Sequence, residues 1–236
     1  MKIRGRRRCG DCGEEWSYYE TDSVACPTCG SLRSVGIEDG RTLHTDAAID
    51  LDLTEVRADV DARPLREVAA DAEEIALRYV STRGFVHAGE LRPLDETAVA
   101  ASQLRHVAAH LRRSIREPSE AVEAHFLALL AGAPAGDRPE DVPEELRAPH
   151  GLAIADVVTR YRDDVTAWLE ENPREVDLPL EALRDHGRRI EALDGDVPTT
   201  EAEGLLRAAR EVGAYLREDD ESALVRARDR LGDLGE

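Results

Sequence analysis

Lysine, methionine and aromatic side chains are scarce in this sequence. Lys2 is the only lysine among 31 cationic residues, there is a single methionine, and phenylalanine and tryptophan occur twice each. Aspartate and glutamate together number 50, so the formal net charge is −19. We interpret this diffuse acid excess as a halophilic adaptation to molar salt, in which the Debye length falls to about 3 Å and like charges are screened. A nucleic-acid mimic, or a ligand for a basic partner, is the alternative.

The sequence also lacks a long apolar run. The longest stretch that is nearly apolar, residues 124–135, contains His125 and is too short to cross a bilayer. The basic start MKIRGRRR is not followed by the apolar segment of a secretory signal. We therefore expect a cytoplasmic protein without a membrane segment, whose thiols stay reduced. The sequence does not determine the oligomeric state.

Cysteine is absent after position 29, and the four cysteines form two C-x-x-C pairs thirteen residues apart, Cys9 with Cys12 and Cys26 with Cys29. Reduced thiols at this spacing predict a tetrahedral site for one zinc ion, as in a zinc ribbon. A rubredoxin-like iron site uses the same ligands, but the separation between the pairs is short for that class. Four protein ligands leave no open position for water or substrate, so the predicted role of the metal is structural.

Charge and periodicity divide the chain into unlike parts. Residues 1–36 hold six cations and five acids, a net charge of +1, which leaves −20 for the rest. We predict a mainly α protein, in which a small three-stranded zinc ribbon at residues 1–36 is followed by an acidic linker at 37–62. Helical spacing of apolar residues then predicts an all-α helical bundle domain over 63–236, with a long loop near 131–149.

The segment before the first cysteine pair is the most basic part of the chain. If it is one strand, its alternate side chains project on one face, opposite Ile3 and Cys9. Cations in such a row can track a phosphate backbone, and nearby aromatic rings can stack on bases. The candidate contacts to a partner or to nucleic acid are Lys2, Arg4, Arg6, Arg8, Trp16 and Tyr18.

Local patterns predict some details of the helices. Asp95 precedes an apolar stripe as an N-cap, and Thr200 with Glu203 has the spacing of a capping box. His125 shares an apolar face and is interpreted as a core histidine. His106 and His110 lie opposite the apolar stripe of their helix, so we expect them to face solvent.

Residues 1–36 resemble zinc ribbons of the transcription-factor-IIB type, with Cys9, Cys12, Cys26 and Cys29 as the matching ligands. The whole chain is also similar to a family of uncharacterised proteins of salt-loving archaea that join such a ribbon to an acidic helical domain. The similar stretches are RGFV, RPLDET, LRHVA and LDGDVP. The first resemblance implies a transcription-related ribbon, whereas the second implies no activity. The general initiation factor continues with repeated basic domains, and the acidic, unrepeated body here departs from that pattern.

Three classes of function remain open. A zinc-stabilised, non-catalytic adaptor that binds another protein is favoured, because the sequence contains no P-loop, dinucleotide fingerprint or G-x-S-x-G motif. A nucleic-acid-binding regulator is the first alternative. An enzyme with a site in the helical domain is the second, since sites built between helices leave few short motifs.

Overall fold

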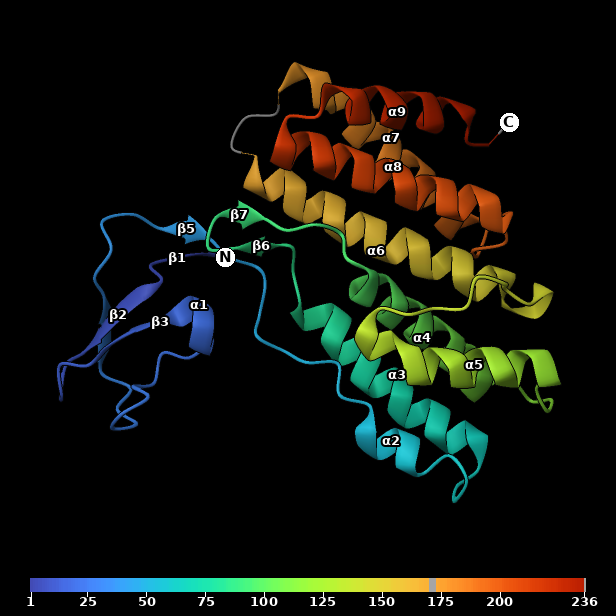
Figure 1. Ribbon diagram of the computed structural model, residues 1–236, viewed down its shortest axis with the longest axis horizontal. Helices are drawn as coiled ribbons and strands as arrows, with labels where there is room; N and C mark the ends of the chain where they lie inside the picture. Colours follow the sequence, from blue (N-terminus) through green and yellow to red (C-terminus); the bar gives the residue numbers. More distant parts are fainter. Residues whose placement is uncertain (170–172, 236) are drawn as a thin grey trace.

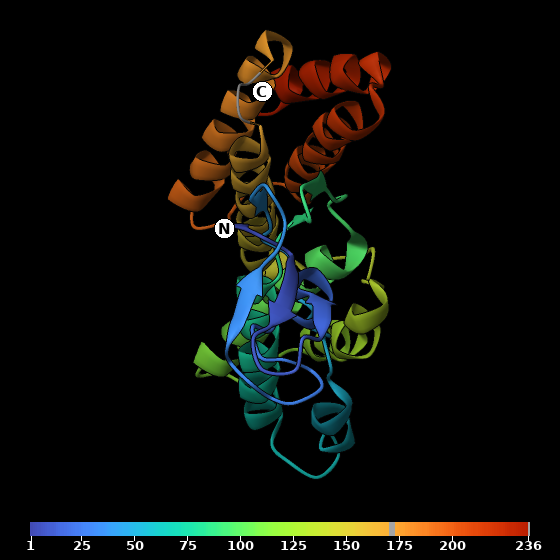
Figure 2. The ribbon, with the colours of Figure 1, turned by 90° about the vertical axis from the view of Figure 1, so that its left-hand side faces the viewer.

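The protein is mainly helical, with a small β-rich module at one end (Figure 1). The computed structural model describes residues 1–169 and 173–235. We call residues 1–36 the cysteine module and the helices that follow it the helical body. In the end-on view of Figure 2 the module lies in front of the middle of the body. The expected mainly α architecture is confirmed.

The cysteine module is built on a three-stranded antiparallel sheet with the strand order β3–β2–β4. Its central strand places Arg7 opposite Trp16 on one side and Cys9 opposite Ser34 on the other. A single helical turn, α1, follows β3 directly. The elements are β2 (Arg6–Cys9), β3 (Glu15–Ser17), α1 (Tyr18–Thr21) and β4 (Ser34–Gly36).

The expected continuous strand before Cys9 is wrong, because the chain breaks at Gly5. The preceding β1 (Lys2–Ile3) pairs with β5 (Thr42–Leu43) in a separate two-stranded sheet. Gly5 lies against the ring of Tyr19, where a Cβ atom would be only 1.9 Å from a ring carbon. The Gly5 N–H donates to the Glu38 carboxylate over 2.7 Å instead of to a neighbouring strand. Glycine therefore leaves room for the Tyr19 ring at the point where the chain passes from β1 to β2.

Residues 37–62, expected to be a linker, are packed onto the rest of the molecule. They contain β5 and a short helix, α2 (Thr54–Ala58). Leu51, Leu53 and Val56 are buried in the core of the helical body. The acidic composition of the segment predicted a solvent-exposed linker, and these three apolar residues were not recognised as core residues.

Within residues 1–169 and 173–235, seven longer helices form the helical body, and side-chain N-caps start three of them. Asp95 accepts a hydrogen bond from the Ala98 N–H as expected, and Ser119 and Asp220 act in the same way. The helices are α3 (Leu65–Thr82), α4 (Glu96–Arg113), α5 (Glu120–Gly132), α6 (Arg147–Trp168), α7 (Arg174–Ala192), α8 (Thr199–Glu218) and α9 (Glu221–Asp233). Short elements connect them: β6 (Val86–His87), β7 (Glu90–Leu91), and the 3-10 helices Ala133–Ala135 and Glu144–Leu146.

Two apolar cores meet at α4. Helices α2 to α5 enclose one core, to which α4 contributes Leu104 and Val107. Helices α6 to α9 and the β6–β7 hairpin enclose the other, which receives Val99 from the same helix. Figure 1 shows α6 as the member of the second group that lies next to α4. Among the described residues, none of the helices combines the length and the apolarity needed to cross a membrane.

Helix α7 begins at Arg174 and contains Pro179 in its interior. Proline has no N–H, so the carbonyl of Glu175, four residues before it, loses its helical donor. The guanidinium of Arg228 on α9 donates to that carbonyl over 2.6 Å. A donor from another helix therefore allows the proline inside α7.

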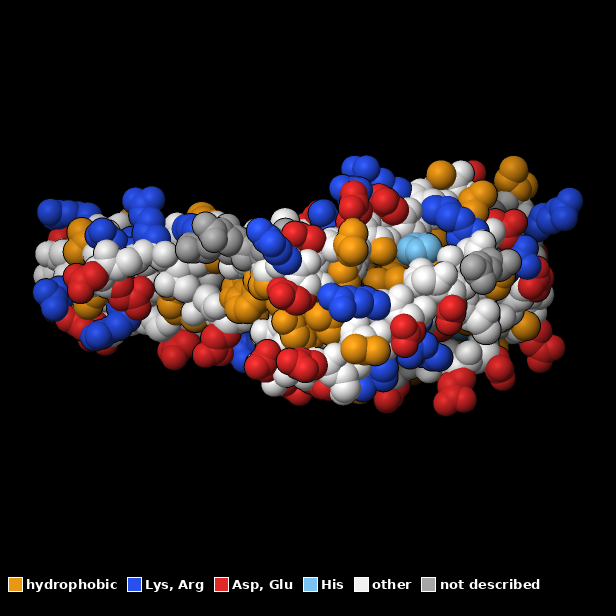
Figure 3. Space-filling model, turned by 90° about the horizontal axis from the view of Figure 1, so that it is seen from above, with side chains coloured by type: hydrophobic (Ala, Val, Ile, Leu, Met, Phe, Trp, Pro, Cys, Tyr) orange, Lys and Arg blue, Asp and Glu red, His pale blue; other side chains and the backbone are white. Residues whose placement is uncertain are grey.

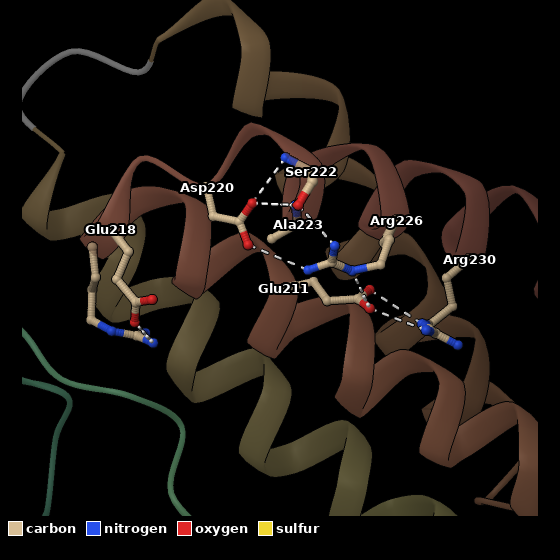
Figure 4. Close-up of polar contacts among 8 residues, drawn as sticks. Glu211, Glu218, Asp220, Ser222, Ala223, Arg226 and Arg230 are labelled. Carbon is tan, nitrogen blue, oxygen red and sulfur yellow. Dashed lines mark hydrogen bonds and ion pairs between the residues drawn. The ribbon is translucent and has the colours of Figure 1, made fainter.

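Helices α8 and α9 form an antiparallel pair joined by charged contacts (Figure 4). The carboxylate of Glu211 on α8 lies 3.1 Å from Arg230 and 3.7 Å from Arg226, both on α9. Asp220 caps α9 and also lies 3.4 Å from Arg226. These contacts cover the edge of the apolar interface between the two helices.

Candidate metal centre

Two similar turns carry the cysteines. In the first, Gly13 N–H donates to the Cys9 carbonyl over 3.2 Å, and in the second Gly30 N–H donates to the Cys26 carbonyl over 2.8 Å. Both glycines have a positive φ, near 80° and 71°, which L residues rarely adopt. The matching geometry directs the two thiols of each pair toward the other pair.

The four sulfur atoms form one compact cluster, all within 4.8 Å of one another. The Sγ atoms of Cys9 and Cys29 are 3.6 Å apart, and so are those of Cys12 and Cys26. A disulfide requires about 2.05 Å. A tetrahedron with Zn–S bonds of about 2.3 Å has edges of about 3.8 Å. The cluster therefore has the donor set and the dimensions of a metal centre.

Backbone groups support a thiolate at Cys9, whereas burial and the neighbouring sulfur atoms raise the pKa of Cys12 to about 12. The N–H groups of Cys12 and Asp11 lower the pKa of Cys9 to about 6, and the Asp11 nitrogen lies 3.4 Å from the Cys9 sulfur. Cys9 and Cys26 are buried beside Trp16, whereas Cys12 and Cys29 are exposed. All four thiolates would be used as ligands, so a bound metal has no vacant tetrahedral position.

The predicted basic residues do not form one uninterrupted row. Lys2 belongs to the sheet of β1 and β5, and Arg4 lies over Gly36. Arg6 and Arg8 remain on one face of β2, where both pair with Glu15, over 3.0 Å and 2.6 Å. These contacts, first that with Arg8, lower the pKa of Glu15, so its carboxylate stays charged and offsets part of the positive field.

The two aromatic candidates lie in different surroundings. Trp16 is only 9% exposed, packs with Cys9 and Cys26, and donates from Nε1 to the Ser23 carbonyl. This corrects the expectation that Trp16 stacks on a partner, because its ring belongs to the core of the module. Tyr18 is half-buried, edge-on to His44.

A cluster of aromatic rings, which sequence reasoning missed, connects the module to the helical body. His44 lies between Tyr19 and His87, with ring centroids 4.9 Å and 5.0 Å away. Its Nδ1 accepts a hydrogen bond from Ala88 N–H over 3.2 Å, so the opposite ring nitrogen carries the proton. Burial first, then the nearby His87, lower the pKa of His44. No local motif links these residues, since they come from three separate segments.

Of the predictions made for residues in the helices, that for His125 was correct and those for His106 and the capping box were wrong. His125 is buried, as expected of a core histidine, and its Nδ1 lies 3.1 Å from the Asp141 carbonyl oxygen. His106 does not face open solvent, because its side chain is only 18% exposed and lies 3.8 Å from Asp156 on α6. The expected capping box is wrong: α8 begins at Thr199, and Glu203 pairs with Arg138.

The comparisons with known proteins identify a family but no function. Searches of curated proteins and of solved structures gave no significant match. The model of a family of unknown function, DUF7117, matches residues 1–231, from the cysteine module into α9. The chain therefore belongs to the DUF7117 family of unknown function.

Proposed function

We propose that this protein is a zinc-binding, non-catalytic adaptor. One zinc ion, held by the two cysteine pairs, would stabilise a zinc ribbon at residues 1–36, and the outer face of that ribbon would bind another protein. The compact cluster of four thiols carries the proposal. Zinc would supply a cross-link between the two turns and no reaction chemistry, because its four positions are filled by sulfur.

The outer face of the module supports binding to a protein. Val35 on β4 is 61% exposed and lies directly opposite Arg8, while Leu32, just before β4, is 74% exposed. The buried centre of a protein interface is more apolar than the rest of the surface, and arginine is enriched at interfaces. Seen from above, the module end also carries cationic and acidic side chains together (Figure 3). A mixed surface of this kind favours a folded protein over a uniformly negative polymer.

Nucleic acid remains the second candidate partner, and one observation favours it. Arg4, Arg6 and Arg8 are all exposed in a module that carries a net positive charge. Because Glu15 pairs with Arg6 and Arg8, we expect fewer than four phosphates to be neutralised. A plot of the logarithm of affinity against the logarithm of salt concentration should then have a slope shallower than about −3.6, the value for four phosphates.

The zinc part is tested by elemental analysis of protein purified without added metal. The expected content is about one zinc per chain, reduced by Cys12→Ser. Ser81→Cys is the matched control, because it adds a thiol at an exposed position on α3 and should leave the zinc content at one. An iron-containing preparation, or a zinc content that follows the number of thiols, would contradict the proposal.

The adaptor part is tested by photo-cross-linking in the native host at its own salt concentration. A photoreactive residue at position 32 should give a discrete adduct with a protein, and Val35→Glu should abolish that adduct. The same residue at Leu178, which is also 74% exposed but lies on α7, is the control. Adducts to nucleic acid at position 32 would favour the regulator, and equal adducts at both positions would contradict a specific interface.

A further inference from the structure

A cavity of about 620 Å³ opens in the helical body, far along the chain from the cysteines. Its wall includes the loop at residues 136–142, His150 on α6 and the first three turns of α8. The metal centre does not extend here. Among the described residues, the four cysteines are the only group of three or more metal-binding side chains whose ligand atoms converge.

A buried hydrogen-bond donor without an acceptor lines this cavity. His150 is only 4% exposed, and its Nδ1 lies 3.2 Å from the amide nitrogen of Gln103. An amide nitrogen can only donate, so Nδ1 accepts and the proton of the neutral ring is on Nε2. That Nε2 has no hydrogen-bond partner within the described residues, although Glu203 Oε1 lies 3.4 Å away. Burial lowers the pKa of His150 to about 4, which keeps the ring neutral.

The start of α8 adds further donors to the same wall. Pro198 precedes this helix, and no side chain caps it. The Glu201 and Ala202 N–H groups bond to the Pro198 carbonyl, whereas those of Thr199 and Thr200 have no protein acceptor among the described residues. The N-terminal end of a helix of 20 residues also carries a partial positive charge.

Two arginines line the wall, and only Arg207 is free of protein hydrogen bonds and ion pairs among the described residues. The Arg207 side chain is also exposed. Arg138 is held by the Glu203 carboxylate through two contacts of 2.5 Å and 3.0 Å. Glu96 is similarly occupied by Arg210 at 2.7 Å. The carboxylates of Glu203 and Glu96 are therefore neutralised by arginine. The polar groups of the wall that remain without a partner are hydrogen-bond donors.

The loop that closes the cavity is anchored. Arg138 ties it to α8, and His125 contacts the Asp141 carbonyl oxygen. Gly136, at a φ of 82°, makes the turn into the loop. Asp137 and Glu140 are exposed on this loop. Their charge disfavours a long polyanion, which would have to run past them, and a volume of about 620 Å³ is that of a small-molecule site.

We propose that this cavity binds a small molecule through a carboxylate or phosphate group, which accepts hydrogen bonds from His150 Nε2, from Arg207 and from the N-terminal N–H groups of α8. Acceptors of this kind satisfy every unpaired donor named above, and helix N-termini commonly bind such anions. The site is independent of the metal centre and of the adaptor role.

The test is a titration of the full, metal-containing protein, labelled with ¹⁵N in its histidines and backbone. Sodium phosphate and sodium acetate are added in separate arms at pH 7.5, with sodium chloride adjusted to hold the ionic strength constant. The readouts are the His150 Nε2–H signal and the Thr199 and Thr200 amide signals. A saturable shift of all three with phosphate, with acetate or with both supports the site, and the arm that saturates identifies the chemistry.

Variants decide whether these groups act together. Arg207→Gln should weaken the binding about tenfold, as expected for the loss of one charge-assisted hydrogen bond. Arg78→Gln, which removes an exposed arginine from α3, is the matched control and should leave the binding unchanged. Shifts that do not saturate with either anion, or an affinity unaffected by Arg207→Gln, would overturn the proposal.

Discussion

If the cysteine module holds the proposed zinc ion, removing that ion should unfold the module and leave the helical body folded. The core of the module consists of three buried residues, Cys9, Trp16 and Cys26, of which only Trp16 is a large apolar side chain. Structural zinc contributes about 10–16 kcal/mol to the folding of comparable small modules. Nothing in a core of this size can replace that contribution. The helical body, in contrast, has two extensive apolar cores of its own.

The structure sets the size of the expected signals. The four residues of α1 are the only helical turn in the module, whereas the other α-helices of the described residues run from 5 to 22 residues. Far-ultraviolet circular dichroism at 222 nm should therefore change little on chelation. Trp16 should lose its apolar surroundings, so its fluorescence emission should shift to the red.

A single substitution separates this signal from that of the body. Trp168 is the only other tryptophan, and its Nε1 donates to the Gly89 carbonyl. In a Trp168→Phe variant, all tryptophan emission reports on Trp16. The assay follows this emission and the circular dichroism during titration with a chelator, and then after zinc is returned. In the reverse control, Trp16→Phe, the emission of Trp168 should stay nearly constant.

Two results would refute this reasoning. Loss of most of the helical signal would mean that the module and the body fold as one cooperative unit, held by the contacts around Tyr19, His44 and His87. An unchanged Trp16 emission after complete removal of zinc would mean that the module folds without a metal.

Two further predictions concern the helical body. The pKa of His150 is lowered to about 4 in the folded protein, against about 6.5 in the unfolded chain, so the unfolded chain binds the extra proton between these values. The free energy of unfolding is therefore not reduced by this group above about pH 6.5. It falls as the pH approaches 4, by about 2 kcal/mol between pH 7.5 and 5. Urea unfolding should show this loss, and it should be smaller in His150→Gln; an equal loss in both proteins would refute it. Arg228→Ala should cost about 1 kcal/mol, because the Glu175 carbonyl loses its donor, and less in a Pro179→Ala background, where residue 179 regains an N–H. Equal costs in the two backgrounds, measured by thermal unfolding, would show that the bond to Glu175 does not stabilise α7.

Local rules were sufficient for part of this protein. Each C-x-x-C pair requires one tight turn, and a turn depends on neighbouring residues. Because a tetrahedral site needs four ligands, the sequence also predicts that the two pairs meet, and their sulfur atoms do lie together. Helix periodicity and the Asp95 cap also depend on residues within four positions of each other. The mainly α fold and the candidate metal ligands could be predicted for this reason.

Other features depend on residues far apart in the sequence. Trp16 looked like a surface aromatic residue until Cys9 and Cys26 were placed around it. Glu203 has the spacing of a capping box, but Arg138, 65 positions away, supplies a stronger charged partner.

The break at Gly5 and the cavity beside His150 have the same kind of cause. The break depends on the pairing of β1 with β5, about 40 residues away, and the cavity requires a loop, α6 and α8 to meet. The spacing of residues encodes which neighbours can share a turn or a helix face. Which distant side chains bury, pair or crowd one another is decided only when the elements pack, because those contacts depend on three-dimensional distance and on the water that packing excludes.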